Sequence, residues 1–436
     1  MRARAARTAL AGSFALVALA SARDASALGG TAFGEASRVS ALADSATARE
    51  GDVGSLVLNP ASLADQTEPV VAVGGQVGQL RAWFARDGEP RASRDRWIGG
   101  YGFAVGTPLP GAWLRHVRVG LSMHLPAAHV LQVTVPERVD APMSPVYDAR
   151  PERPSMAFGV AGDPWPWLHV GAALVVVPTL TLPTAVTYQA GRSGNPETDL
   201  TVRLDRDLQM VVAPIVGLRV DPWRKLGLAL VWRSRAQSIA TGDNRTVAGG
   251  VLADDPLRYA SFWDPTELVA GVVGRPTERL SLSLDVARAS WSAFHNGYDE
   301  PVAPTFRDVW STRVGVEGRV ARGLVARGGW AYEPSPVTPQ VARTNYLDAD
   351  TQVLALGAGV DLRELAGLPV TIDAHARARL GATQSVTKET AHMADADPTL
   401  PGRQIESLGY PGYASQSRFF QAGVTVTFFV GKKGAK

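Results

Sequence analysis

The sequence predicts an all-β protein: a 14-stranded antiparallel transmembrane β-barrel with an N-terminal hatch, or plug, segment inside the lumen. Three observations lead to this fold class. Apolar and polar residues alternate with a period of two over most of the chain after residue 70. Fourteen such runs can be counted, and many reach ten residues or more, which is long for strands of soluble proteins. The connections between runs alternate between long polar stretches and tight turns.

The composition excludes several other classes of protein. The chain has 436 residues, no cysteine and 19% charged residues. A disulfide scaffold, a thiolate metal site and a cysteine nucleophile are therefore excluded. The formal net charge of +3 lies within residues 1–27, where four arginines accompany one aspartate. Because the remainder is neutral, we expect no nucleic-acid partner.

Residues 1–27 have the pattern of a secretory signal peptide. A basic start is followed by the uncharged apolar run Thr8–Ala22 and by the small residues Ala25-Ser26-Ala27. The alternative interpretation is a short buried helix. With the signal peptide at 1–27, we predict three further parts of the chain: a hatch at 28–69, a barrel at 70–430 and a basic periplasmic tail at 431–436.

The predicted strands each have one apolar and one polar face. In the run from Val370 to Leu380, apolar residues alternate with Thr, Asp, His and Arg. A soluble β-sandwich would bury the apolar face, whereas a membrane barrel would turn it to lipid. Strand length and the alternating connections favour the barrel. The strands lie near 70–84, 97–107, 115–134, 154–162, 167–189, 199–221, 226–241, 260–275, 279–293, 309–320, 323–333, 351–363, 369–386 and 416–429.

The positions of the tryptophans support a barrel that has its tight turns on the periplasmic side and its long loops outside. An even number of strands places both chain ends on the periplasmic side, with the tight turns. Amphipathic aromatic rings favour the two membrane interfaces, so they form girdles. The predicted periplasmic girdle contains Trp113, Trp165, Trp167 and Trp223, and the predicted outer girdle contains Trp83, Trp97, Trp263, Trp291, Trp310 and Tyr332. We expect the protein in the outer membrane of a Gram-negative-type bacterium.

Residues 28–69 do not alternate and contain many small and polar side chains. A barrel of 14 strands has a lumen too wide for wall side chains alone to fill. A plug made from this segment fills it, and a periplasmic extension is the alternative.

Three motifs carry a resemblance to a known family. The first is A-L-A-D-S-A-T-A-R-E-G-D-V-G-S-L-V-L-N-P-A-S-L at 41–63. The second is W-D-P-T-E-L-V-A-G-V-V-G at 263–274 with W-S-A-F at 291–294, and the third is R-G-G-W-A-Y-E-P-S-P-V at 327–337 with L-D-A-D at 347–350. In this order they resemble the long-chain fatty-acid outer-membrane transporters of the FadL type, which include transporters of aromatic hydrocarbons.

The resemblance implies passive, diffusion-driven uptake of hydrophobic compounds, such as long-chain fatty acids or related lipids and hydrocarbons. It also implies lateral exit through the wall near a kinked third strand, where this chain has His124 and Pro126. Proline cannot donate to a β-ladder, so a local break is expected, with an ordinary edge irregularity as the alternative. Asn59, Pro60 and Ala61 correspond to the hatch motif, and Asp348 and Asp350 to the acidic pair near the ligand site.

Arginines on the polar face of the strands are candidates for binding a carboxylate head group, because a guanidinium binds a carboxylate bidentately. We name Arg233, Arg313, Arg319 and Arg327. Acidic residues share the predicted lumen, so structural ion pairs are the alternative role. The family's head-group site includes a lysine after the W-S-x-F element, where this chain has His295 and Asn296.

Motifs of hydrolases, metalloproteases and nucleotide-binding loops are absent from the sequence, so we expect no enzyme activity, no cofactor and no metal site. Expected partners are a hydrophobic small molecule, outer-membrane lipid and lipopolysaccharide, and the barrel-assembly machinery during biogenesis. The alternative function is a non-transporting barrel of the same fold that acts as a surface anchor or secretion partner.

Overall fold

The computed structural model describes residues 36–431 apart from 50, 52, 112, 113, 115, 129–139, 146–152, 182–186, 191–199, 204–206, 249–250, 297–298, 300 and 390–406. The predicted signal peptide, the first part of the predicted hatch at 28–35 and most of the predicted tail, 432–436, lie outside the described residues.

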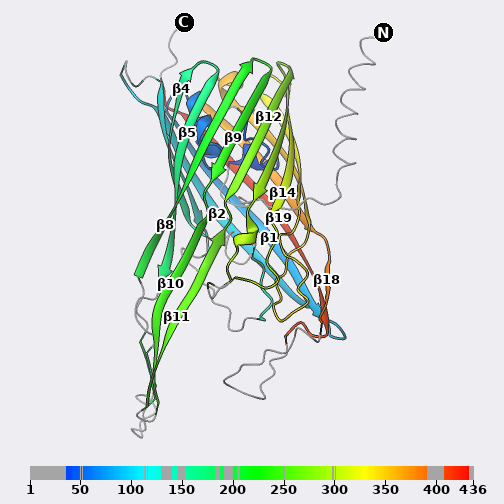
Figure 1. The fold of residues 1–436 in the computed structure, drawn as a ribbon. Coiled ribbons are helices and arrows are strands. Elements are labelled where there is room, and N and C mark those ends of the chain that lie inside the picture. Colours follow the sequence, from blue (N-terminus) through cyan, green and yellow to red (C-terminus); the bar gives the residue numbers. More distant parts are fainter. Residues whose placement is uncertain are drawn as a thin grey trace.

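Fourteen antiparallel strands form one closed barrel, as the alternation predicted (Figure 1). Closure is made between the first and last strands, in a register from Val70↔Phe429 to Arg86↔Tyr413. The barrel strands are β1 (Val70–Arg86), β2 (Ala92–Pro108), β3 (Val117–Pro126), β4 (Ser155–Trp165), β5 (Leu168–Thr181), β8 (Asp207–Trp223), β9 (Leu226–Arg233), β12 (Glu267–Thr277), β13 (Leu280–Ala289), β14 (Val309–Ala321), β15 (Leu324–Glu333), β16 (Thr351–Asp361), β17 (Val370–Gly381) and β19 (Gly412–Phe429). A short strand, β18 (Gln384–Thr387), pairs with the outer end of β19.

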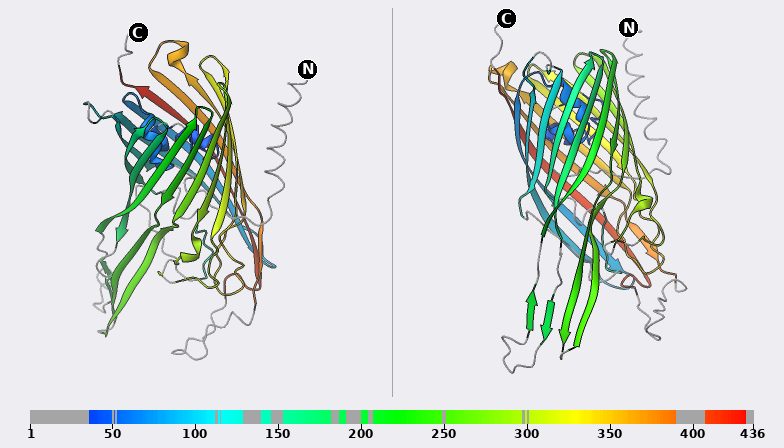
Figure 2. Two further views of the ribbon diagram at one scale, coloured as in Figure 1. Left: turned by 45° about the horizontal axis from the view of Figure 1, so that its top comes forward. Right: turned by 60° about the vertical axis from the view of Figure 1, so that its left-hand side comes forward.

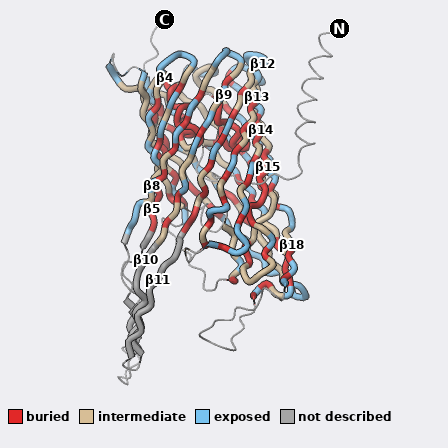
Figure 3. The backbone as a smooth tube through the Cα atoms, in the orientation of Figure 1, coloured by how far each residue is buried: buried red, intermediate tan, exposed pale blue. Residues whose placement is uncertain are grey.

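The strands form here because their alternating sequence suits two different surroundings. Exposed and more buried positions alternate along the barrel wall (Figure 3). The outward positions form an apolar belt, in which Val77, Phe158, Leu230 and Leu356 are exposed. This belt faces lipid, and the opposite face lines the lumen. At one end the strands are joined by tight turns, such as the one at Gly323 with φ of 64°.

A second sheet extends beyond the other end of the barrel (Figures 1 and 2). It contains β6 (Thr187–Ala190), β7 (Leu200–Arg203), β10 (Ala236–Ala248) and β11 (Val251–Asp264), in the order β11-β10-β6-β7. The stretch 242–259, predicted to be a loop, is therefore mostly a hairpin. No lipid surrounds this extension, so its strands do not need the alternation by which the barrel strands were found.

Residues 36–66, here called the N-terminal segment, pack against the inner face of the barrel near the tight turns (Figures 1 and 2). The segment contains α2 (Ser37–Ser40), η1 (Val53–Val57) and η2 (Pro60–Asp65). Two other short helical turns, η4 (Trp291–Ala293) and α3 (Leu362–Leu365), lie in connections between strands. None of the helices in the described part of the chain has the length and apolar character needed to cross a bilayer.

Candidate functional site in the lumen

The Asn59-Pro60-Ala61 motif forms the start of η2 and holds two parts of the N-terminal segment together. The Asn59 side chain accepts a hydrogen bond from the Ala61 N–H (3.0 Å) and donates one to the Thr47 carbonyl (2.8 Å). Asn59 is 1% exposed, and Pro60 supplies the fixed φ that the first helical position requires. The motif therefore links the alanine-rich turn to the second half of the segment.

Glycines of the barrel wall make room for the N-terminal segment. At eight strand glycines, a Cβ atom would come within 3.0 Å of an atom of the segment or overlap it: Gly106, Gly120, Gly159, Gly171, Gly217, Gly271, Gly329 and Gly357. Several are cross-strand neighbours: the first three form a row across β2, β3 and β4, and the next two face each other across β5 and β8. Glycine is needed where another part of the chain approaches this closely. These glycines were not predicted from the sequence, although a glycine at an inward strand position was the available signal.

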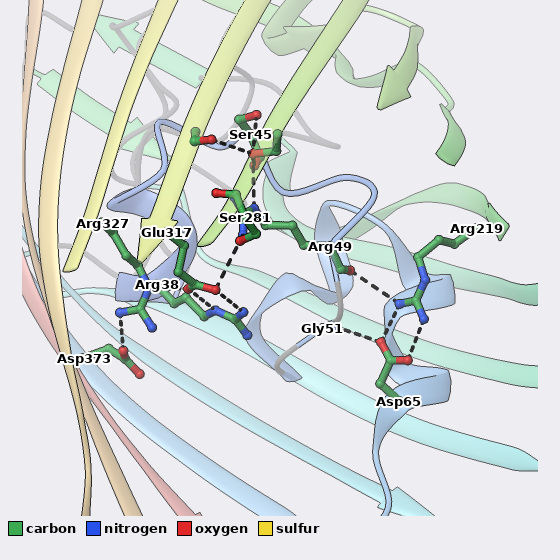
Figure 4. A network of polar contacts seen from close by, with 12 residues as sticks. Arg38, Ser45, Arg49, Gly51, Asp65, Arg219, Ser281, Glu317, Arg327 and Asp373 are labelled. Carbon is green, nitrogen blue, oxygen red and sulfur yellow. Dashed lines mark hydrogen bonds and ion pairs between the residues drawn. The ribbon is translucent and has the colours of Figure 1, made fainter. Parts of the chain in front are cut away.

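Guanidinium–carboxylate pairs join the segment to the wall (Figure 4). Arg38 of the segment makes two hydrogen bonds of 3.0 Å to Glu317 of β14. Arg219 of β8 binds Asp65 of the segment, with one hydrogen bond of 2.6 Å. Arg219 is 1% exposed, so the segment supplies a charge that a buried cation needs.

Deeper along the segment, Arg377 of β17 binds Asp44. The Thr47 N–H donates a 3.0 Å hydrogen bond to Asp285 of β13. The segment is thus fixed by partners from strands far apart around the barrel, which agrees with its almost completely buried side chains.

The arginines predicted to contact a head group are bound by protein carboxylates. Arg233 pairs with Glu267 and also donates to the Val57 and Leu58 carbonyls, at 3.2 and 2.7 Å. Arg313 lies 3.3 Å from the same glutamate. Both arginines therefore take part in a buried network of wall and segment.

The other two predicted arginines, Arg327 and Arg319, also have carboxylate partners, but they lie at different positions along the barrel wall. Arg327 bridges Glu317 and Asp373, with both contacts at 2.6 Å. Arg319 lies at the tight-turn end of β14, where it is half exposed and 3.2 Å from Glu364. The structure thus gives all four a carboxylate partner, and it brings three of them to the lumen.

The acidic pair of the L-D-A-D stretch lies in the outer connection between β15 and β16. Asp350 accepts hydrogen bonds from the Tyr332 hydroxyl (2.6 Å) and the Ser335 N–H (2.9 Å). Burial raises the pKa of Asp348 to about 7, although hydrogen bonds from Ser335 and the Ala349 N–H act in the opposite direction. In the described structure, both side chains bind residues of this connection.

An aromatic group fills the outer end of the lumen, and we call it the outer cluster. Phe294 and Phe306 stack at 4.6 Å, and Tyr346 meets both of them edge-on. Trp263 and Trp291, predicted as girdle residues, are instead buried here with their rings 5.2 Å apart. Trp291 lies in η4 after β13 has ended, and Trp263 lies next to the last residue of β11, so neither takes the lipid-facing position predicted for it. The cluster also includes Leu80, Ile98 and Phe419 from β1, β2 and β19.

The third strand departs from regular pairing at its outer end. The ladder between β3 and β4 runs only as far as His124↔Ser155, whereas β2 still pairs with Pro126. Nearby, a cavity of about 30 Å³ lies between the segment and β1, β2, β3, β17 and β19. Ser37, Gln76, Ser122, His375 and Thr425 are among its lining residues. It has room for roughly two water molecules, not for a lipid chain.

No group of residues suited to metal binding occurs in the described part of the chain.

Comparisons with known proteins agree with this architecture. A crystal structure of a Pseudomonas aeruginosa FadL homologue is similar with a TM-score of 0.62 and 14% identity, covering 94% of this chain and 100% of that one. The P. putida toluene transporter TodX is similar with a TM-score of 0.56 and 13% identity, covering 91% and 98%. The chain has the FadL-type fold. It is therefore an outer-membrane β-barrel, as the sequence predicted.

A sequence relative gives a shorter match. Alkane uptake protein A of Marinobacter nauticus is 27% identical over 186 residues, which cover 38% of this chain and 40% of that protein. The matched region thus spans well under half of the relative. No protein-family model matches the chain. Two of the similar structures are named as a toluene transporter and a monoaromatic hydrocarbon channel.

Proposed function

We propose that this protein takes up hydrophobic compounds across the outer membrane by passive diffusion, and that it is not an enzyme. The observation that carries the proposal is the FadL-type fold, shared over 94% of the chain with the FadL homologue and over 91% with a toluene transporter. A partial relative named for alkane uptake supports the same class of cargo.

Within this class, neutral hydrocarbons fit the lumen better than fatty acids. Arg233, Arg313 and Arg327 already bind protein carboxylates. A fatty-acid head group would therefore have to displace one of these carboxylates from its arginine. The outer cluster consists of aromatic and aliphatic side chains, and such surroundings favour a ligand without charge. A carboxylate entering this surface would lose its hydration without gaining a partner.

We further propose that the N-terminal segment is the hatch of this barrel and that cargo leaves sideways beside β3. The segment's buried ion pairs and its fit to the wall glycines support the first part. The end of the β3–β4 ladder at His124 supports the second, because fewer hydrogen bonds hold the wall together there. His124 and Pro126 remain predicted members of this opening.

Uptake by whole cells tests the proposal. A deletion strain and its complemented counterpart are given labelled hexadecane, toluene or oleate, and initial rates are measured. We expect the deletion to slow hexadecane or toluene uptake at least about fivefold, with a smaller effect on oleate. Normal rates for all three compounds would exclude the transport role and favour the surface anchor or secretion partner instead.

A further inference from the structure

Two arginines face each other on the outer surface of the barrel where it closes. Arg81 of β1 is directly opposite Arg418 of β19, and both are exposed. Like charges at directly opposed positions of antiparallel strands are destabilising. A barrel wall that keeps such a pair therefore suggests an anion from outside the protein.

Neighbouring acidic residues do not neutralise this pair. On its other side, Arg81 is opposite Asp95 of β2, but their side-chain atoms are 3.9 Å apart and both side chains are more than half exposed. Such an exposed contact contributes little. Arg418 has no ion pair or hydrogen bond from its side chain to any described residue. A third cation, Arg91, lies 4.2 Å above the Trp83 ring, two residues along β1 from Arg81. Three cations and one carboxylate leave a local charge of +2.

The height of the pair on the wall identifies the kind of partner. Val71 and Phe428 are opposed near the tight-turn end of β1, and Arg81 is ten residues further towards the outer end. With roughly 3.3 Å per residue and a tilt of about 40°, this separation is about 25 Å along the membrane normal, the usual height of the apolar belt. Trp97, 67% exposed, lies one row below the pair, at the position of an interface aromatic.

We propose that Arg81 and Arg418, assisted by Arg91, bind a phosphate of lipid A, the membrane anchor of lipopolysaccharide. The pair lies at the level where the phosphorylated headgroups of the outer leaflet meet the acyl chains. Guanidinium groups bind phosphate oxygens with charge-assisted, bidentate hydrogen bonds. The exposed apolar residues below, including Phe420 and Tyr101, would contact the acyl chains of the same lipid. The site would secure the seam between the first and last strands.

Native mass spectrometry of the full-length protein in detergent tests this site. The probes are diphosphoryl lipid A, dephosphorylated lipid A and inorganic phosphate. We expect wild type to retain diphosphoryl lipid A, and the double variant Arg81→Gln/Arg418→Gln to bind it about tenfold less. Arg322→Gln is the matched control, since it removes an exposed arginine at the tight turn between β14 and β15 and should bind like wild type.

A stability measurement supplies an independent readout. Without lipid A, Arg418→Gln should melt no lower than wild type, because it removes a like-charge contact. With lipid A, wild type should gain more in melting temperature than the variant does. The proposal is overturned if the double variant retains lipid A as wild type does, if dephosphorylated lipid A binds equally well, or if millimolar inorganic phosphate displaces the lipid.

Discussion

Arg377 on the barrel wall binds Asp44 of the N-terminal segment through two hydrogen bonds of 2.9 and 2.6 Å, and each side chain is 1% exposed. Asp44 has a φ of 64° and follows Ala43 with a φ of 50°, so the pair holds a turn that most residues avoid. This contact therefore both supports the unusual turn at Ala43 and Asp44 and attaches the segment to the barrel wall.

Replacing Arg377 with Met should loosen the segment while leaving the barrel folded. The change removes the guanidinium that Asp44 binds, and breaking a buried ion pair in this way costs about 3–5 kcal/mol. We expect higher ion conductance in planar bilayers and faster proteolysis of the segment, with normal heat-modifiability on a gel. Adding Asp44→Asn should restore part of the loss. Wild-type conductance in the single variant would show that the pair does not hold the segment.

Adding a side chain at Gly329 should displace the segment from the wall. A Cβ atom there would overlap the backbone at Leu42 and Ala43, so Gly329→Val should raise conductance as Arg377→Met does. Gly328 is the matched control, because its Cβ would have ordinary contact with Val316 at 3.5 Å. Equal conductance of the two valine variants would contradict the close fit of wall and segment.

Asn59→Ala removes a helix cap and the link to Thr47. Loss of such a cap costs about 1 kcal/mol, so we expect the segment to become more sensitive to protease by several-fold. The barrel should keep its heat-modifiable mobility. Asn59→Asp keeps the cap acceptor but loses the donor to Thr47, and it should lie between wild type and the alanine variant. Unchanged protease resistance in the alanine variant would weaken the role given to this motif.

A disulfide can test whether the segment moves during uptake. The natural chain has no cysteine, so a Val53→Cys/Gly106→Cys pair would be the only thiols. The Val53 Cβ lies 3.4 Å from the position of a Cβ at residue 106, close to disulfide geometry. Because the segment is so firmly bound, we expect uptake by the oxidised protein to stay within about twofold of that after reduction. A loss of uptake that dithiothreitol reverses would show that the segment must move.

Asp348 should make the outer connection sensitive to pH. Its pKa is raised in the folded protein to about 7 from an ordinary value near 3.9, so the folded connection favours the protonated acid. The resulting stability is fully present below about pH 4 and is lost as the pH rises through 7. We expect proteolysis at 334–350 to increase between pH 5 and 8 in wild type. Asp348→Asn should show no such increase, and a pH-dependent increase in that variant would assign the effect to another group.

The barrel could be predicted from sequence because lipid imposes a period of two on every wall strand. The extension made by β10 and β11 could not, since Gly242, Asp243 and Asn244 have the composition of a turn and no lipid enforces alternation. The sequence pattern identified Arg233, Arg313 and Arg327 as residues of the lumen, but it did not identify the carboxylates that bind them. Arg377 and Asp44 are 333 residues apart, and their pairing follows only from the closed barrel.

The wall glycines make the segment and the barrel a matched set. Their positions follow the path of one particular backbone, so a segment from a relative with a different path would meet either clashes or gaps. A change in the path of the segment would therefore require matching changes at these wall glycines. A chimera that joins this barrel to a foreign segment should still assemble into a closed barrel. Its ion conductance should be higher than that of wild type, because the foreign segment would not fit the wall.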